Sequence, residues 1–263
     1  MRRLGVVGLV SLDRVDGGAP QLGGAPYYAA RALRLLGHPA VIATKLAPGD
    51  RPRLAALGIP AEARSAARTI SFRIENEGDR RRMAIDRLGE GWTPAEAGGW
   101  LARALAGADP VHAGALTRAD FPAETLAALR RGRILSLDGQ GLVRPAAEGE
   151  VVPDADYDPE VLRQIDVLKL GEEEAEALGL GLDERSLGSL GVGEVVVTLG
   201  TRGAVVYHNG LAEHVPCRPV ATRDPTGAGD VFMAAYLSFR ARRHGPPSAA
   251  RLATDVVRAL LPP

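Results

Sequence analysis

Cysteine is almost absent from this chain. The single thiol, Cys217, cannot form an internal disulfide, which favours a reducing compartment. No apolar run is long enough to cross a bilayer. The short run Leu4–Val10 is followed at once by Ser11 and Asp13 and by no small-residue cleavage site, so it predicts a buried strand rather than a signal peptide. We therefore expect a cytoplasmic protein.

An excess of charge of either sign is also missing, because 32 basic residues balance 32 acidic ones. Nucleic acids and membrane surfaces both favour a basic excess, so neither is an expected partner. The P-loop pattern is absent, and no cysteine–histidine cluster has the spacing of a zinc site. With 263 residues, the chain is nevertheless long enough to bury a large core.

Lysine is nearly missing as well. Lys45 and Lys169 are the two lysines among the 32 basic residues, and all the others are arginines. A GC-rich genome is the simple explanation for this bias. It makes Lys169 a residue of interest, because a lysine is kept there in a chain that otherwise uses arginine.

What is present is a regular alternation of strand and helix patterns. Strands are expected near residues 4–10, 40–44, 110–113, 133–137, 167–170 and 194–198, and helices near 24–36, 94–106, 123–131, 159–164, 172–178, 227–242 and 248–261. This order predicts an α/β fold with a mostly parallel sheet covered on both faces. No repeat or low-complexity linker divides residues 1–263, which predicts a single domain.

One segment departs from this rhythm. Thr69–Glu75 and Arg81–Ile85 alternate polar and apolar residues around Asn76-Glu77-Gly78-Asp79, which is typical of a hairpin. We expect this hairpin to project from the main body as part of a small sheet. Ligands of parallel sheets bind beyond the carboxyl ends of the strands, so such a sheet is placed to act as a lid.

The strongest chemical pattern is Asp224-Pro-Thr-Gly-Ala-Gly-Asp230, followed by an apolar helix. The glycines allow a tight turn at a helix N-terminus, where backbone amides and the helix dipole attract an anion. Asp230 in the first turn points to the same place, where it is suited to accept a proton from an attacking hydroxyl. The alternative is that Asp230 only caps the helix.

This string resembles the second signature of the ribokinase-like, or PfkB, carbohydrate kinase family. The resemblance implies a ribokinase-like three-layer α/β/α fold with a β-strand lid, and it implies ATP and Mg²⁺ as cofactors. It implies that Gly227, Ala228 and Gly229 form an anion hole and that Asp230 is the catalytic base. Asp224 and Thr226 are then expected to shape the loop and help to place the metal and phosphates.

Two further segments resemble the family's nucleotide and metal sites. Thr198, Gly200 and Gly203 correspond to the strand and glycine turn at the nucleotide, although alone they read as an ordinary β-turn. Glu174 corresponds to the glutamate of the family's Asn-x-x-Glu segment, which implies a role at Mg²⁺; the alternative is a helix-capping acid. Gly171 replaces the asparagine, and Lys169 is expected to approach the phosphates.

The acceptor side also resembles the family. Gly23 and Gly24 belong to the first signature, in which substrate lies against backbone at a helix start, although Tyr28 replaces the usual asparagine. Asp13 corresponds to an aspartate that binds substrate hydroxyls, and its alternative is a solvated turn residue. Residues 14–22 are expected to complete the lid with residues 69–85.

A last segment bears on specificity. Asp138-Gly-Gln-Gly-Leu-Val-Arg144 resembles a stretch in the family branch that includes myo-inositol kinases. Gln140 and Arg144 would then bind substrate hydroxyls or a γ-phosphate, whereas the alternative is a polar loop with a surface ion pair.

The expected function is an ATP-dependent kinase for a hydroxyl of a small sugar or polyol. The narrower alternative is a myo-inositol kinase. A different class remains open, a nucleotide-binding sensor that has lost catalysis, and the replacements at Tyr28 and Gly171 motivate it. A homodimer formed through the lid is a further expectation.

Overall fold

The computed structural model describes residues 2–77, 80–218 and 225–260. Its main sheet has nine strands in the order β14-β13-β12-β11-β9-β8-β1-β4-β5, and all neighbouring pairs from β12 to β5 are parallel. The strands are β1 (Arg3–Gly8), β4 (Ala40–Leu46), β5 (Ala61–Ser65), β8 (Ala108–Gly114), β9 (Leu135–Asp138), β11 (Val167–Gly171), β12 (Glu194–Thr198), β13 (Ala204–His208) and β14 (Leu211–Val215). The predicted mostly parallel sheet is confirmed.

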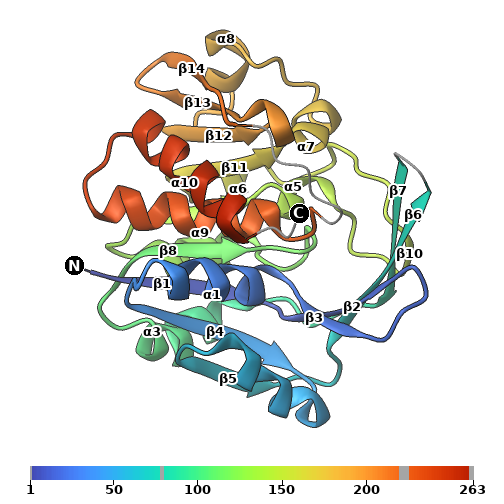
Figure 1. Cartoon of the computed structure of the whole chain (residues 1–263). Coiled ribbons are helices and arrows are strands. Elements are labelled where there is room, and N and C mark those ends of the chain that lie inside the picture. The colour runs from blue at the N-terminus through green and yellow to red at the C-terminus, as the bar shows by residue number, and fades with distance from the viewer. Residues whose placement is uncertain (1, 78–79, 219–224, 261–263) are drawn as a thin grey trace.

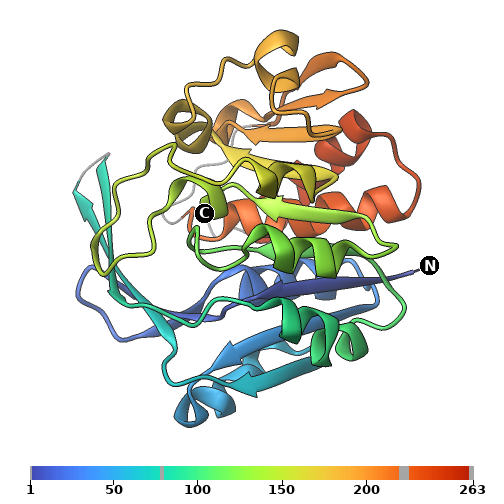
Figure 2. The ribbon, with the colours of Figure 1, turned by 180° about the vertical axis from the view of Figure 1, so that it is seen from behind.

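Helices cover both faces of this sheet, which gives three layers. In Figure 1 the front layer consists of α1 (Ala25–Leu35), α9 (Ala228–Ala241) and α10 (Pro246–Leu260). The opposite face carries α2 (Pro94–Gly98), α3 (Trp100–Ala104), α4 (Ala123–Arg130), α6 (Glu160–Arg163) and α7 (Glu172–Ala177), as Figure 2 shows from behind. The remaining short elements are the helices α5 (Gln140–Val143) and α8 (Glu184–Gly188) and the 3₁₀ segments η1 (Pro48–Leu57) and η2 (Gly200–Arg202).

Strand alternation explains why two cores form. Val6 of β1 and Val196 of β12 pack with the α1, α9 and α10 layer, whereas their neighbours Val7 and Val195 pack with the opposite layer. All four are fully buried. Because successive side chains of a strand point to opposite faces, continuous valine runs are what a sheet buried on both sides requires.

A second sheet of five strands forms the lid, in the order β10-β7-β6-β2-β3. Its strands are β2 (Ser11–Val15), β3 (Gln21–Gly23), β6 (Ile70–Glu77), β7 (Arg80–Arg87) and β10 (Gly149–Glu150). It stands to one side of the main body in Figure 1. The predicted lid is confirmed, but it begins at Ser11 instead of residue 14 and gains β10.

One predicted element is wrong in detail. The helix expected over residues 94–106 is two short helices, α2 and α3, because Gly99 between them has φ −99° and ψ −106°, outside the helical region. Two successive glycines, Gly98 and Gly99, carry the weakest helical preference of any residue except proline. The break lets the chain turn back against β4.

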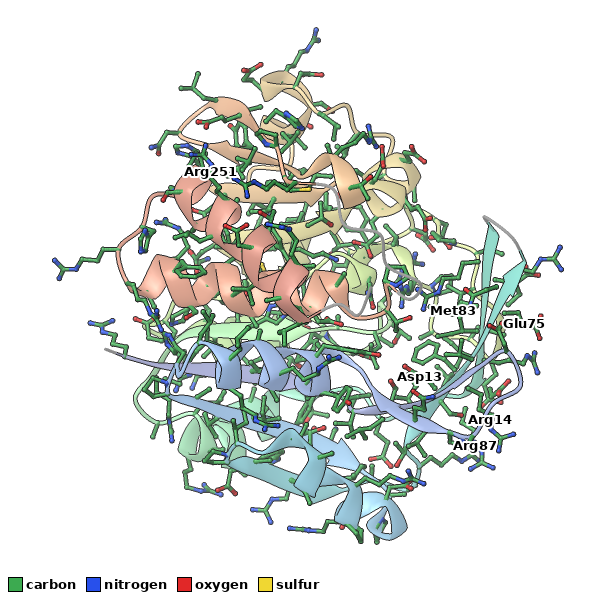
Figure 3. All side chains as sticks on the ribbon, in the orientation of Figure 1. Asp13, Arg14, Glu75, Met83, Arg87 and Arg251 are labelled. Carbon is green, nitrogen blue, oxygen red and sulfur yellow. The ribbon has the colours of Figure 1, made fainter. Side chains whose placement is uncertain are left out.

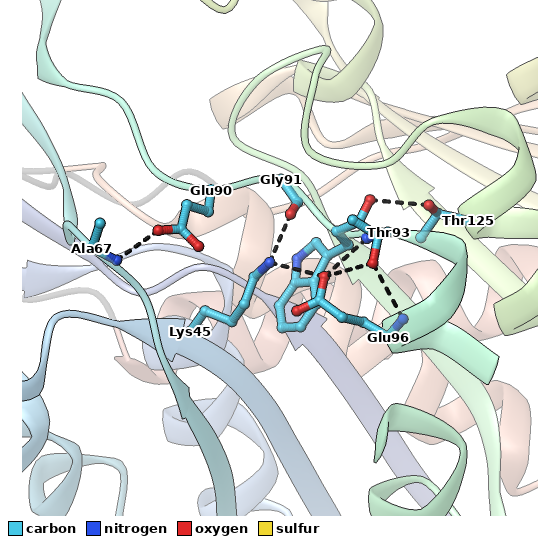
Figure 4. A network of polar contacts seen from close by, with 8 residues as sticks. Lys45, Ala67, Glu90, Gly91, Thr93, Glu96 and Thr125 are labelled. Carbon is cyan, nitrogen blue, oxygen red and sulfur yellow. Dashed lines mark hydrogen bonds and ion pairs between the residues drawn. The ribbon is translucent and has the colours of Figure 1, made fainter. Parts of the chain in front are cut away.

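Lys45 anchors the segment that leaves the lid after β7. Its ammonium donates to Gly91 O at 2.6 Å and to Glu96 Oε2 at 3.1 Å, as Figure 4 shows. It also lies 4.6 Å from the centre of the Trp92 ring. The side chain is 4% exposed, so its charge depends on Glu96 for compensation.

We expect Glu96→Gln to lower the free energy of unfolding by about 2 kcal/mol, because it removes the ion-pair partner of the buried Lys45 ammonium. Urea unfolding at neutral pH measures this. Glu124→Gln is the matched control, since Glu124 is an exposed acidic residue in the first turn of α4. It should cost less than about 0.5 kcal/mol. Equal losses for the two variants would show that the Lys45 pair is not specifically stabilising.

Candidate active site

The larger of two neighbouring cavities lies between the lid and the carboxyl ends of the main strands, with a volume of about 400 Å³. It brings together ten of the residues predicted from sequence: Asp13, Gly24, Gln140, Arg144, Lys169, Thr226, Gly227, Ala228, Gly229 and Asp230. In Figure 3 Asp13 and Met83 face the space between lid and body, and Arg14, Glu75 and Arg87 lie on the outer side of the lid.

The second cavity, of about 180 Å³, lies on the other side of the same turn. It contains the predicted nucleotide residues Thr198, Gly200 and Gly203. Its remaining walls are largely apolar and include Cys217, Phe232 and Val257. Pro225, Ala228 and Gly229 line both cavities, so the turn separates two compartments and borders each.

The sequence folds into this turn for identifiable reasons. Gly227 has φ +77°, and a Cβ at this position would overlap the ring of Tyr28, so both the backbone and the space demand glycine. A Cβ at Gly229 would lie 2.8 Å from Nζ of Lys169. Helix α9 begins directly after Gly227, which directs the positive end of its dipole into the larger cavity. Asp224 lies outside the described residues.

Charged groups converge beneath the turn. Nζ of Lys169 lies 3.4 Å from Oδ2 of Asp138 and 3.8 Å from Oε2 of Glu174. Lys169 is buried, yet the carboxylates of Asp138, Glu174 and Asp230 together outweigh that desolvation and raise its pKa. Lysine therefore stays protonated here and holds the acidic groups together.

Asp230 is poised to exchange a proton near neutral pH. Burial of its carboxyl group, followed by repulsion from Asp138, raises its pKa to about 7, against the opposing charges of Lys169 and Arg144. The residue borders the cavity and is only half-buried as a whole, while its carboxyl group is enclosed by protein. A carboxylate with a pKa near 7 can act as a general base at physiological pH.

Asp13 offers an acceptor on the opposite wall. It is 8% exposed, and burial raises its pKa to about 6 while Ser11, Arg81 and Arg144 oppose that shift. Its Oδ1 is buried and has no hydrogen-bond partner among the described residues. A Cβ at Gly23 would overlap its carboxylate, which explains that glycine although Gly23 does not line the cavity. A ligand hydroxyl would satisfy the unpaired oxygen.

The two glutamates at the start of α7 have different surroundings. Glu174 is buried, accepts from the Gly171 amide at 2.7 Å and faces Lys169. Glu173 instead lines the larger cavity. Among the described residues, no three acidic, histidine or cysteine side chains form a metal cage. The carboxylates of Glu173 and Glu174 are oxygen donors of the kind that Mg²⁺ takes together with waters and substrate phosphates.

Sequence reasoning assigned no site role to three charged residues of this region. Asp138, at the end of β9, is the partner of Lys169, and Glu173 was interpreted only as a helix-capping acid. Arg81 lines the larger cavity from the lid. A signal for Arg81 was available, because it shares the alternation of the apolar residues Met83 and Ile85.

Sugar and inositol kinases are among the proteins of similar sequence. A fructokinase from Klebsiella pneumoniae is 35% identical over 100 residues, which cover 36% of this chain and 32% of that protein. An inositol 3-kinase from Zea mays is 34% identical over 103 residues, covering 39% of this chain and 24% of that protein. The matched stretches thus span a third or less of these two relatives.

Solved structures support the fold over nearly the whole chain. A pyrophosphate-dependent kinase of the ribokinase family, solved with a pyrophosphate analog and myo-inositol, superposes with a TM-score of 0.81 at 24% identity. The match covers 97% of this chain and 94% of that one, which shows a ribokinase-like fold. None of the described helices has both the length and the apolar character to span a membrane. Residues 11–258 match the pfkB family carbohydrate kinases, and the chain belongs to that family.

Proposed function

We propose that this protein transfers the terminal phosphoryl group of ATP to a hydroxyl of a small sugar or polyol, with Asp230 as the general base. The observation that carries the proposal is that one cavity contains Asp13, the Gly227–Gly229 turn and Asp230. A hydroxyl held by Asp13 would lie in the same space as a phosphate held at the turn. The second cavity, across the turn, then takes the rest of the donor.

The chain's own groups would act in sequence. Asp13 accepts a hydrogen bond from one acceptor hydroxyl and so orients the molecule, while the lid excludes water that would otherwise hydrolyse the donor. Asp230 takes the proton of the reacting hydroxyl, whose oxygen attacks the γ-phosphorus in line as the bond to the leaving ADP oxygen breaks. The turn and Lys169 stabilise the negative charge on the phosphoryl oxygens.

Mg²⁺ would be held near Glu173 and Glu174, with donor phosphates and water completing its ligands. When bound, it would neutralise phosphate charge. We keep Glu174 as the proposed metal-site residue because its carboxylate is fixed by Gly171 and Lys169 at the edge of the phosphate region. Glu173 is added because it lines the cavity. Thr198, Gly200 and Gly203 would contact the nucleotide.

Two specific observations keep narrower alternatives open. Gln140 and Arg144 line the cavity with Asp13 and Asp230, as the resemblance of residues 138–144 to the myo-inositol kinase branch implies, and an inositol 3-kinase is among the relatives. The second concerns the donor, since a structure with the same fold is a pyrophosphate-dependent kinase. Pyrophosphate would lie in the larger cavity with the acceptor and leave the apolar cavity unused.

Asp230→Asn should fold and bind ATP but lose turnover by about 10²-fold to 10⁴-fold, because the amide cannot accept the hydroxyl proton. Coupled ADP-release assays measure turnover, and calorimetry measures ATP binding. Asp156→Asn, which removes a carboxylate that is 98% exposed and lines neither cavity, is the control and should keep wild-type rates. Turnover retained by Asp230→Asn would exclude Asp230 as the base.

An acceptor and donor matrix tests the substrate class. We expect wild-type protein to phosphorylate at least one of myo-inositol, ribose, fructose and adenosine with Mg-ATP. The phosphorylated product is detected by ³¹P NMR. Each acceptor is also assayed with pyrophosphate in place of ATP, which identifies the donor. ATP binding without phosphate transfer to any acceptor would contradict the kinase proposal and favour a catalytically lapsed sensor.

A further inference from the structure

The lid places one arginine on its inner face. In the β6–β7 hairpin Asn76 pairs with Arg81, Ile74 with Met83 and Phe72 with Ile85, so these six residues share one side of the sheet. Phe72, Ile74 and Met83 line the larger cavity, and Arg81 lines it with them. Asn76 and Arg81 are the polar residues of this face, and Arg81 lines the cavity although its side chain is exposed to solvent.

That interaction reaches the anion-binding turn. Nη2 of Arg81 donates to Oγ1 of Thr226 at 2.9 Å, across 145 residues of sequence. Thr226 directly precedes Gly227, the N-cap of α9. The described structure therefore has the lid arginine already at the turn that we assign to the transferring phosphoryl group.

The chemistry of this contact suits a further ligand. A guanidinium has five N–H donors in a fixed fork, and the bond to Thr226 uses one of them. Thr226 offers a neutral hydroxyl, so this bond does not compensate the arginine's charge. Arg81 also lines the same cavity as Asp13, and its charge opposes the burial that raises the pKa of that carboxyl group. A tetrahedral oxyanion between Asp13 and Thr226 would lie within its reach.

We propose that Arg81 is a catalytic residue that binds the phosphoryl group during transfer. The inference rests on the proposed kinase function. As the acceptor oxygen forms its bond to phosphorus and the bond to the leaving oxygen breaks, the proton goes to Asp230 and the electron pair leaves with the donor remnant. Charge on the equatorial oxygens is then shared by Arg81 from the lid and by the turn from the body. Closure of the lid would then also complete the active site, because it brings Arg81 to the turn.

Variants at Arg81 test this directly. Arg81→Gln should lower kcat by about 10²-fold or more with a smaller change in the acceptor KM, and Arg81→Lys should recover part of that loss by restoring the charge. Arg14→Gln is the control, because Arg14 is an exposed lid arginine on the outer side in Figure 3. It removes the same charge from the lid and should leave kcat within about twofold of wild type.

Thr226→Val tests whether Arg81 acts in catalysis or only holds the lid against the turn. If Arg81 only ties the lid down through the Thr226 hydroxyl, Thr226→Val and Arg81→Gln will have equal effects, and the proposal is wrong. If Arg81 binds the phosphoryl group, Thr226→Val will lose at least tenfold less activity than Arg81→Gln. Equal kcat for Arg81→Gln and Arg14→Gln would also overturn the proposal.

A binding measurement keeps the inference independent of the acceptor. Calorimetric titration with inorganic pyrophosphate should give a Kd about tenfold weaker for Arg81→Gln than for wild type and Arg14→Gln. If wild-type protein transfers phosphate to no acceptor, the proposed kinase function is contradicted. The titration still shows whether Arg81 binds the anion. Pyrophosphate affinity unchanged in Arg81→Gln would contradict an anion-binding role for this arginine.

Discussion

Three carboxylates and one buried ammonium set the character of the candidate site. Asp138, Glu174 and Asp230 converge on Lys169, and Arg144 is a second positive charge that acts on Asp230. Burial of the Asp230 carboxyl group, together with repulsion from Asp138, raises its pKa to about 7 against these two positive charges. The same lysine packs against Gly229 of the turn. Loss of the lysine would disturb the acid cluster and the anion-binding turn together.

Local chemistry in the sequence was enough to predict most of the main sheet, the lid hairpin and the turn residues 226–230. The valine-rich strands, the Asn-Glu-Gly-Asp turn and the Gly-Ala-Gly string each carry their own signal. Edge strand β5 gave only a weak signal, because Ala61–Ser65 is mostly exposed and the apolar residues that alternate along it are two small alanines. Strand β10 has two residues and forms only by pairing with β7. Such elements depend on a partner strand that is distant in sequence.

Contacts between distant segments explain what sequence reasoning missed in the site. The pairing of Asp138 with Lys169 follows from the parallel neighbours β9 and β11, and the contact of Arg81 with Thr226 follows from the lid folding over the body. The different surroundings of Glu173 and Glu174 depend on the rotation of α7 about its axis, fixed by the bond from Gly171. The roles of the site residues remain proposals, whereas their convergence on one cavity is a property of the fold.

The pH dependence of turnover tests the central claim most directly. A base must be ionised to accept the hydroxyl proton, so the account predicts that kcat/KM of wild-type protein rises with pH and levels off above an apparent pKa near 7. The measurement needs one active acceptor, saturating donor and buffers of constant ionic strength. A rate that is independent of pH between about 5 and 8, or that falls over this range, would contradict Asp230 as the base.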